Sequence, residues 1–117
     1  MKPLKIYIAG PYTPNSDLHD APRLAHRNVR TAIKAGLEVI EKGHIPFIPH
    51  LTHFIHLEAE KPLPASYFYD YDMVWLQCCD ALLYLGNSKG ADRELEWAKA
   101  RGLRIFHSVE EIPSAKE

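Results

Sequence analysis

Two acidic residues, Glu94 and Asp72, fall on the apolar sides of the helices predicted around them. The helix predicted over residues 91–101 has an apolar stripe made of Ala91, Leu95, Ala98 and Gly102. Successive helical residues turn by about 100°, which places Glu94 about 60° from the middle of this stripe. The carboxylate is therefore expected to be half-buried near the helix start, where the helix dipole favours the ionised form. An ionised carboxylate in a dry pocket suits the covalent mechanism of a glycosidase.

Asp72 has the same inward placement on the helix predicted over residues 66–79. The apolar stripe of this helix consists of Phe68, Tyr71, Trp75 and Cys79. Asp72 lies about 40° from the middle of the stripe, whereas Asp70 faces the other way. Two inward carboxylates suggest divided roles, in which one attacks and the other moves a proton or holds the leaving base. The alternative is structural, because acids that cap a loop or pair with a buried Arg or His are also perturbed.

Two loops offer backbone N–H groups to an anion. Residues 86–91 read Gly-Asn-Ser-Lys-Gly-Ala and precede a helix, whose N-terminus attracts negative charge. Ser88 can donate to a phosphate oxygen, Lys89 adds a cation, and small residues such as Gly90 permit close approach. Residues 9–13, Ala-Gly-Pro-Tyr-Thr, form a similar loop. The alternative for the first loop is an ordinary helix cap with Ser88 or Gly90 at the N-cap.

Three histidines, His50, His53 and His56, recur at a spacing of three residues. Such a spacing spreads their side chains across about 120° of a helix. No carboxylate partner is evident beyond Glu58, so no metal site is expected. His50, just past the second predicted strand, is expected to line a pocket.

Strands alternate with helices along the chain. Strands are predicted over residues 4–9, 45–48, 81–85 and 103–107, and helices over 23–42, 66–79 and 91–101, with one or two helical turns in 50–57. This alternation predicts an α/β fold of Rossmann or flavodoxin type, a small doubly wound parallel sheet of about four to five strands with helices on both faces. Ligands of such folds bind beyond the carboxyl ends of the strands, where the loops at 10–17, 49–56 and 86–90 meet.

Length and composition bound the class of protein. The 117 residues fit a single domain over residues 1–117, and 46% hydrophobic with 25% charged residues predicts a packed core. A formal net charge of −1 argues against a nucleic-acid binder. No apolar run reaches the length of a membrane span, and no signal peptide is visible. Cys78 and Cys79 are neighbours that cannot form an ordinary bridge, so buried free thiols and a cytoplasmic location are expected.

The chain resembles the nucleoside 2-deoxyribosyltransferase-like superfamily, which includes deoxyribosyltransferases and deoxynucleoside 5′-monophosphate N-glycosidases. Three segments carry the resemblance, Ile-Tyr-Ile-Ala-Gly-Pro at 6–11, Asp-Met-Val-Trp-Leu-Gln-Cys-Cys-Asp at 72–80 and Ser-Lys-Gly-Ala-Asp-Arg-Glu-Leu at 88–95. Together they extend the resemblance over nearly the whole chain, and their order and spacing make it fairly specific.

The resemblance implies a role for each of these residues. Glu94 would be the nucleophile that forms a glycosyl-enzyme intermediate at C1′. Asp72 would assist proton transfer at the base, and Tyr7 would hold the nucleophile by a hydrogen bond. The sugar pocket would be lined by the residues around Gly10 and Pro11. His50 matches a pocket histidine of the monophosphate glycosidases.

The chain also departs from the transferases. They are longer, and their C-terminal segment completes the site of a neighbouring subunit, whereas this chain ends soon after its last predicted strand. It carries Ser88 where the transferases carry an acid. A serine beside a helix N-terminus suits a 5′-phosphate, which a carboxylate would repel. Ser88 and Gly90 are therefore expected to bind substrate, with a nucleotide favoured over a nucleoside.

Three functions follow as hypotheses. We expect a retaining N-glycosidase without a cofactor, in which water or a second base resolves the intermediate, giving a hydrolase or a base-exchanging transferase. The alternative is a non-catalytic nucleotide-binding module in regulation or assembly, for which Glu94 is dispensable. A metal-dependent hydrolase that uses the histidines would lose activity with a chelator. A homodimer or larger homo-oligomer is expected, because the core is small and the face containing Tyr67, Tyr69 and Tyr71 is rich in aromatics.

Overall fold

Four parallel strands form one sheet in the computed structural model, which describes residues 1–12 and 21–116. The strands are β1 (Lys5–Ala9), β2 (Ile45–Phe47), β3 (Ala81–Tyr84) and β4 (Arg104–Phe106). Their order across the sheet is β2-β1-β3-β4, so the winding reverses between β1 and β3. In open α/β sheets, ligands bind beyond the carboxyl ends of the strands at such a reversal.

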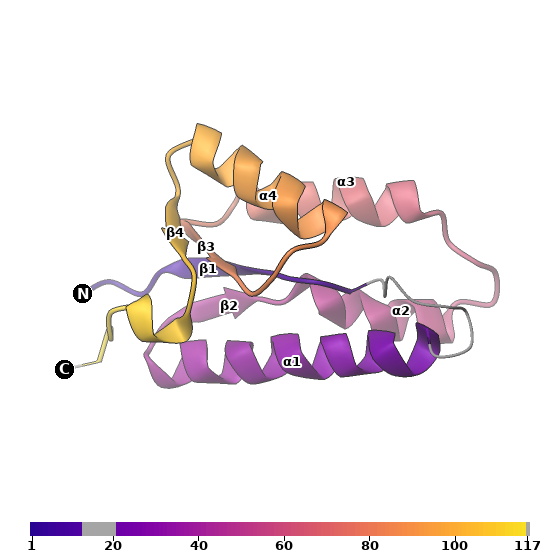
Figure 1. Cartoon of the computed structure of the whole chain (residues 1–117), viewed down its shortest axis with the longest axis horizontal. Coiled ribbons are helices and arrows are strands. Elements are labelled where there is room, and N and C mark those ends of the chain that lie inside the picture. The colour runs from indigo at the N-terminus through magenta and orange to yellow at the C-terminus, as the bar shows by residue number, and fades with distance from the viewer. Residues whose placement is uncertain (13–20, 117) are drawn as a thin grey trace.

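Helices cover both faces of the sheet, which confirms the predicted doubly wound α/β fold (Figure 1). The helical elements are α1 (Ala21–Glu41), the 3-10 turn η1 (Pro49–Leu51), α2 (Thr52–Glu58), α3 (Ala65–Leu76), α4 (Lys89–Ala100) and the 3-10 turn η2 (Val109–Glu111). The long helix α1 packs on one face, and α3 and α4 lie together on the other. No helix among the described residues is long and apolar enough to cross a membrane.

Strand β1 shows how the two faces differ. Alternate residues of a strand point to opposite faces. Ile6 and Ile8 point towards α1 and join an aliphatic cluster with Ala32 and Val39, whereas Tyr7 points towards α3 and α4. Tyr7 brings a hydroxyl group into the second cluster, on the face covered by α3 and α4.

The buried stripe of α3 differs from the predicted one. Phe68 and Leu76 are buried, whereas Trp75 is 45% exposed, so the prediction that Trp75 lies in the stripe is wrong. Residues separated by four positions share a side of a helix, and residues 68, 72 and 76 form such a series. Asp72 is therefore at the centre of the buried side. Cys78 is free and exposed just beyond the end of α3, which corrects the expectation that it is buried.

At the amino ends of the strands, two residues hold the C-terminal segment in place. The Lys42 ammonium donates to two carbonyl groups of residues 109–112, each at 2.6 Å. His44 is 4% exposed. Its Nδ1 accepts from the Leu4 N–H at 2.9 Å, and its Nε2 donates to the Pro113 carbonyl at 2.6 Å. These two partners fix the tautomer of His44 with its proton on Nε2.

Candidate active site

A hydrogen bond joins Tyr7 of β1 to Glu94 of α4. The Tyr7 hydroxyl donates to Glu94 Oε2 at 2.5 Å, a length typical of a bond to a charged carboxylate. Burial and the negative charge of Glu94 raise the pKa of Tyr7 far above its ordinary value. The hydroxyl therefore stays protonated and acts as a fixed donor that holds one oxygen of the carboxylate.

The Glu94 carboxyl has a perturbed pKa. Burial raises it to about 7 against the opposing effect of the Tyr7 hydrogen bond, while Asp72 adds to the rise and Arg93 opposes it. The sequence predicted a carboxylate kept ionised by the helix dipole. In the structure, burial is the largest influence on this carboxyl, and it favours the protonated form.

Asp72 reaches the same site from α3. Its Oδ1 is buried and has no hydrogen-bond partner among the described residues. Burial raises the pKa of Asp72 to about 7. The pKa values of both carboxyls are raised, and two interacting carboxyls titrate as a pair. Tyr7 donates a hydrogen bond to Glu94, whereas Asp72 Oδ1 has no donor among the described residues, so hydrogen bonding favours the charge on Glu94.

The start of α4 is built as an ordinary helix cap. Ser88 is the N-cap, and its Oγ accepts from the Ala91 N–H at 3.1 Å. The helix begins at Lys89 instead of residue 91, so Gly90 lies in the first turn rather than in a loop. An added Cβ at Gly90 would meet nothing within 4 Å, so packing within the protein does not require this glycine.

The loop after β1 packs closely against the end of β3. An added Cβ at Gly10 would lie 3.0 Å from the Leu85 Cβ, so Leu85 would have to shift by a few tenths of an ångström to admit a larger residue. The Leu85 N–H donates to the Ala9 carbonyl at 2.7 Å. The sequence placed Gly10 and Pro11 beside the sugar. The structure puts both at the carboxyl ends of the central strands, while residues 13–17 of that loop lie outside the described residues.

His50 clamps this loop. It is 4% exposed, and its Nε2 donates to the Gly10 and Pro11 carbonyls at 3.0 and 3.1 Å. Its Nδ1 is buried and has no partner among the described residues. Burial lowers the pKa of His50, so the neutral ring is favoured. The sequence predicted a histidine that lines a pocket, but periodicity gave no sign of these two backbone contacts.

The other two histidines lie with aromatic neighbours. His53 Nδ1 is 2.9 Å from the Tyr12 hydroxyl, and the His56 ring lies 4.4 Å from that of Phe68 between centroids. Within residues 1–12 and 21–116, no group of three or more His, Cys, Asp or Glu side chains is arranged to hold a metal ion.

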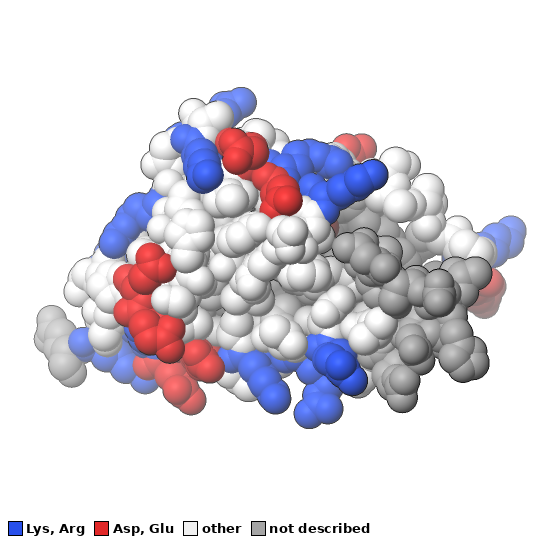
Figure 2. Space-filling view, in the orientation of Figure 1, with Lys and Arg blue, Asp and Glu red and all other residues white. Residues whose placement is uncertain are grey.

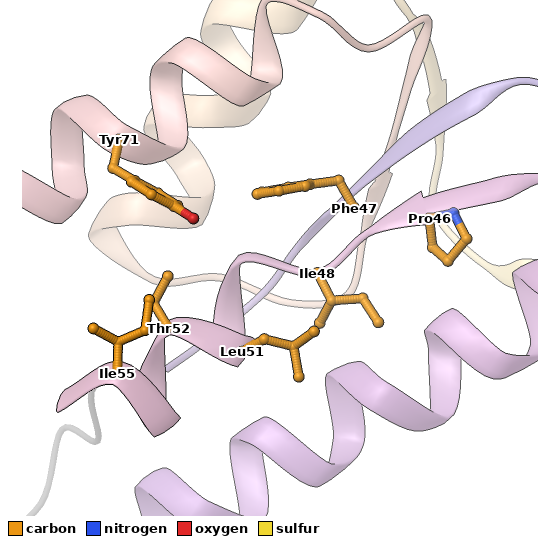
Figure 3. A pocket seen from close by; sticks show the side chains of 7 residues that line it. All are labelled: Pro46, Phe47, Ile48, Leu51, Thr52, Ile55 and Tyr71. Carbon is orange, nitrogen blue, oxygen red and sulfur yellow. The ribbon is translucent and has the colours of Figure 1, made fainter. Parts of the chain in front are cut away.

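An apolar groove of about 260 Å³ opens between β2, α2 and α3 (Figure 3). It is lined by Pro46, Phe47, Ile48, Leu51, Thr52, Ile55 and Tyr71. The Phe47 ring stacks on Tyr7 at 5.6 Å and on Trp75 at 5.5 Å, so one wall of the groove adjoins the tyrosine that holds Glu94. Nothing in the sequence pattern predicted this groove, because its walls come from segments far apart in the chain.

On the face seen in Figure 2, charged side chains of both signs lie mostly towards the rim, and Lys and Arg lie along part of the edge formed by α1. A second hollow of about 300 Å³ lies on α1, lined by His26, Arg27, Arg30, Thr31 and Lys34. Since α1 covers the opposite face of the sheet from Tyr7 and α4, this hollow is separate from the carboxyl pair.

The chain belongs to the family described as "Domain of unknown function (DUF7768)", which matches residues 4–108. The match runs from β1 to β4 and includes Tyr7, Asp72 and Glu94. No curated protein matches the chain. Because the family description states no activity, the function has to be inferred from the site.

Proposed function

We propose that this protein cleaves the N-glycosidic bond of a nucleoside 5′-monophosphate or a nucleoside through a covalent glycosyl-enzyme intermediate. One observation carries the proposal: two neighbouring, partly buried carboxyls share a site, and Tyr7 donates a hydrogen bond to Glu94. Such an arrangement favours the charge on Glu94 and the proton on Asp72, the division of roles that a retaining glycosidase needs. The resemblance to the nucleoside 2-deoxyribosyltransferase-like superfamily assigns the same roles.

The reaction takes two steps. In the first, a Glu94 carboxylate oxygen attacks C1′, the bond from C1′ to the base nitrogen breaks, and Asp72 gives its proton to the departing base. The sugar remains as an ester of Glu94. In the second step, water attacks C1′, Asp72 takes a proton from that water, and the ester bond to Glu94 breaks. When a second base attacks in place of water, the same site performs a transfer.

The start of α4 supports a 5′-phosphate on the substrate. Ser88 Oγ accepts from the Ala91 N–H, which leaves the Ser88 O–H proton available to a phosphate oxygen. The positive end of the α4 dipole also favours an anion at this position. Lys89 begins the helix and adds a cation. A nucleotide is therefore favoured over a nucleoside.

A homodimer or larger homo-oligomer in the cytoplasm is part of the same proposal. Tyr67, Val74 and Trp75 are exposed on α3, beside the apolar groove, and an apolar surface of this kind is typical of an interface between subunits. The free thiols Cys78 and Cys79 fit a reducing compartment.

A chromatographic screen of nucleosides and their 5′-monophosphates for released base tests the proposal. Each substrate is incubated with the protein, with and without a second base. Free base and sugar phosphate alone identify a hydrolase, and a new nucleotide identifies a transferase. Binding of a nucleotide without release of any base would instead support the non-catalytic module and overturn the proposal.

A further inference from the structure

A stack of one arginine on one tyrosine bridges α3 and α4 beside the carboxyl pair. The Arg93 guanidinium carbon lies 3.3 Å from the centroid of the Tyr69 ring, which is direct contact with the face of the ring. Arg93 directly precedes Glu94 on α4, and Tyr69 lies about one helical turn before Asp72 on α3. The contact therefore ties together the two helices that carry the carboxyls.

We propose that the Arg93–Tyr69 stack is a strut that sets the position of Glu94 relative to Asp72 and keeps a positive charge next to Glu94. In this view Arg93 is a positioning residue that acts through Glu94 and does not contact the reacting atoms. The inference rests on the proposed function, because it concerns which carboxyl attacks and which holds the proton.

The Arg93–Tyr69 stack matters because the two carboxyls are chemically alike. Both are partly buried, and burial is the largest cause of the raised pKa of each. Their roles can differ only if the surroundings differ. Tyr7 donates its hydrogen bond to Glu94, and the positive charge of Arg93 lowers the pKa of the same residue. Both influences favour the charge on Glu94 and leave the proton to Asp72.

The groups around Glu94 come from several elements. Tyr7 faces it from β1 and Asp72 from α3, while Arg93 acts from α4 itself. On β3, Tyr84 donates to Asp92 at 2.7 Å, and on β4 Arg104 lies over Phe106. Among the groups named here, Arg93 is the cation that affects the pKa of Glu94.

Arginine suits this role better than lysine does. A guanidinium group is planar and stacks on an aromatic face, whereas an ammonium group is compact and strongly hydrated. Tyr69 is 38% exposed, so the stack lies at the protein surface and salt partly screens its charge. The influence of Arg93 on Glu94 should therefore weaken as ionic strength rises.

The test is an NMR titration of the Glu94 and Asp72 carboxyl carbons, which needs neither substrate nor turnover. We expect Arg93→Met to raise the apparent pKa of Glu94 by about half a unit, which is about threefold in the ionisation constant. Arg101→Met is the matched control, because Arg101 lies over Trp97 at the far end of the same helix, 5.2 Å from the ring centroid. Amide spectra of both variants verify that they are folded.

Substitutions of Tyr69 leave the charge of Arg93 in place and change only the aromatic ring that positions it. Tyr69→Phe keeps the aromatic face and should leave both titrations unchanged, whereas Tyr69→Leu should move the Glu94 titration in the same direction as Arg93→Met. If Glu94 titrates identically in Arg93→Met, Arg101→Met and the natural protein, the proposed role of the Arg93–Tyr69 stack is wrong. Because no catalysis is measured, a protein that releases no base leaves this test intact and refutes only the proposed function.

Discussion

Two histidines, each 4% exposed, lie at opposite ends of the sheet and differ in how their ring nitrogens are used. At the amino ends, His44 bonds the Leu4 N–H with one nitrogen and the Pro113 carbonyl with the other. At the carboxyl ends, His50 uses Nε2 for the carbonyls of residues 10–11, and its buried Nδ1 has no partner among the described residues. The amino end is therefore built for stability.

Two buried polar atoms have no hydrogen-bond partner in the described part of the chain. One is His50 Nδ1, and the other is Asp72 Oδ1 on α3. A buried polar group without a partner costs about 1–3 kcal/mol, so folded proteins keep few of them. The predictions below compare the residues that carry these two atoms with His44, whose two ring nitrogens both have partners.

The largest expected effect is that of Glu94→Gln on base release. The amide keeps the size of the side chain and still accepts from Tyr7, but it is not a nucleophile. We expect base release to fall by about 1,000-fold or more, with little change in the free energy of unfolding. Glu96→Gln is the control, because Glu96 is an exposed residue of the same helix that pairs with Lys99. Equal activity in the two variants would contradict the assignment.

At the opposite end, His44→Leu should reduce stability and spare activity. The substitution leaves the Leu4 N–H and the Pro113 carbonyl unpaired in a buried position, which should cost about 2–4 kcal/mol of unfolding free energy. Denaturant unfolding measures the loss, and base release per folded molecule should stay within about twofold of the natural protein. A large loss of activity in folded His44→Leu would show that His44 contributes to the active site as well as to stability.

His50→Leu should show the reverse pattern on a smaller scale. It releases the loop at Gly10 and Pro11 from its clamp, so we expect base release to fall by about tenfold. The cost to stability should be about 1 kcal/mol, because the substitution also removes the unpartnered Nδ1. Steady-state kinetics and denaturant unfolding of the same preparation measure both. Full activity in His50→Leu would show that the clamp does not matter for the site.

The smallest expected effect concerns stability against pH. The folded-state pKa values of Asp72 and Glu94 are about 7, above their ordinary values of 3.8 and 4.5. The folded state therefore favours the protonated carboxyls, and their contribution to stability is complete below about pH 4 and is lost as pH rises through 7. Asp72→Asn removes one of these groups, so its stability relative to the natural protein should rise with pH by about 1 kcal/mol after solvent screening.

Urea unfolding at several pH values between 4 and 8 measures this difference. Asp70→Asn is the matched control, because Asp70 is an exposed residue of the same helix. A difference between Asp72→Asn and the natural protein that stays constant over this range would show that the Asp72 pKa is not raised.

Periodicity was sufficient to predict which acids lie inside. The spacing of Ala91, Leu95 and Ala98 places Glu94 beside the buried side of α4, and the structure has it there. Asp72 was predicted inside even though the stripe assigned to α3 included the half-exposed Trp75. The alternation of strands and helices likewise predicted the parallel sheet, because a parallel connection requires a crossover.

Contacts between distant segments could not be predicted in this way. The His50 clamp joins residues about 40 positions apart, and nothing in the local pattern specifies its partners. The groove depends on Phe47 and Tyr71 facing each other across a sheet edge. The pKa of Glu94 depends on burial and on the distance to Asp72, which are properties of packing. Sequence spacing gave the direction of side chains, and only the fold gave their neighbours.

The most direct test of the central claim is the mass of the protein stopped during reaction with a 2′-fluoro nucleoside 5′-monophosphate. The fluorine destabilises positive charge at C1′, and we expect it to make the attack of water on the sugar ester slower than the formation of that ester, so that the intermediate accumulates. We predict that the protein gains the mass of one sugar phosphate and that peptide mapping locates it on Glu94. Release of base while Glu94 stays unmodified, or a sugar attached to another residue, would contradict the mechanism.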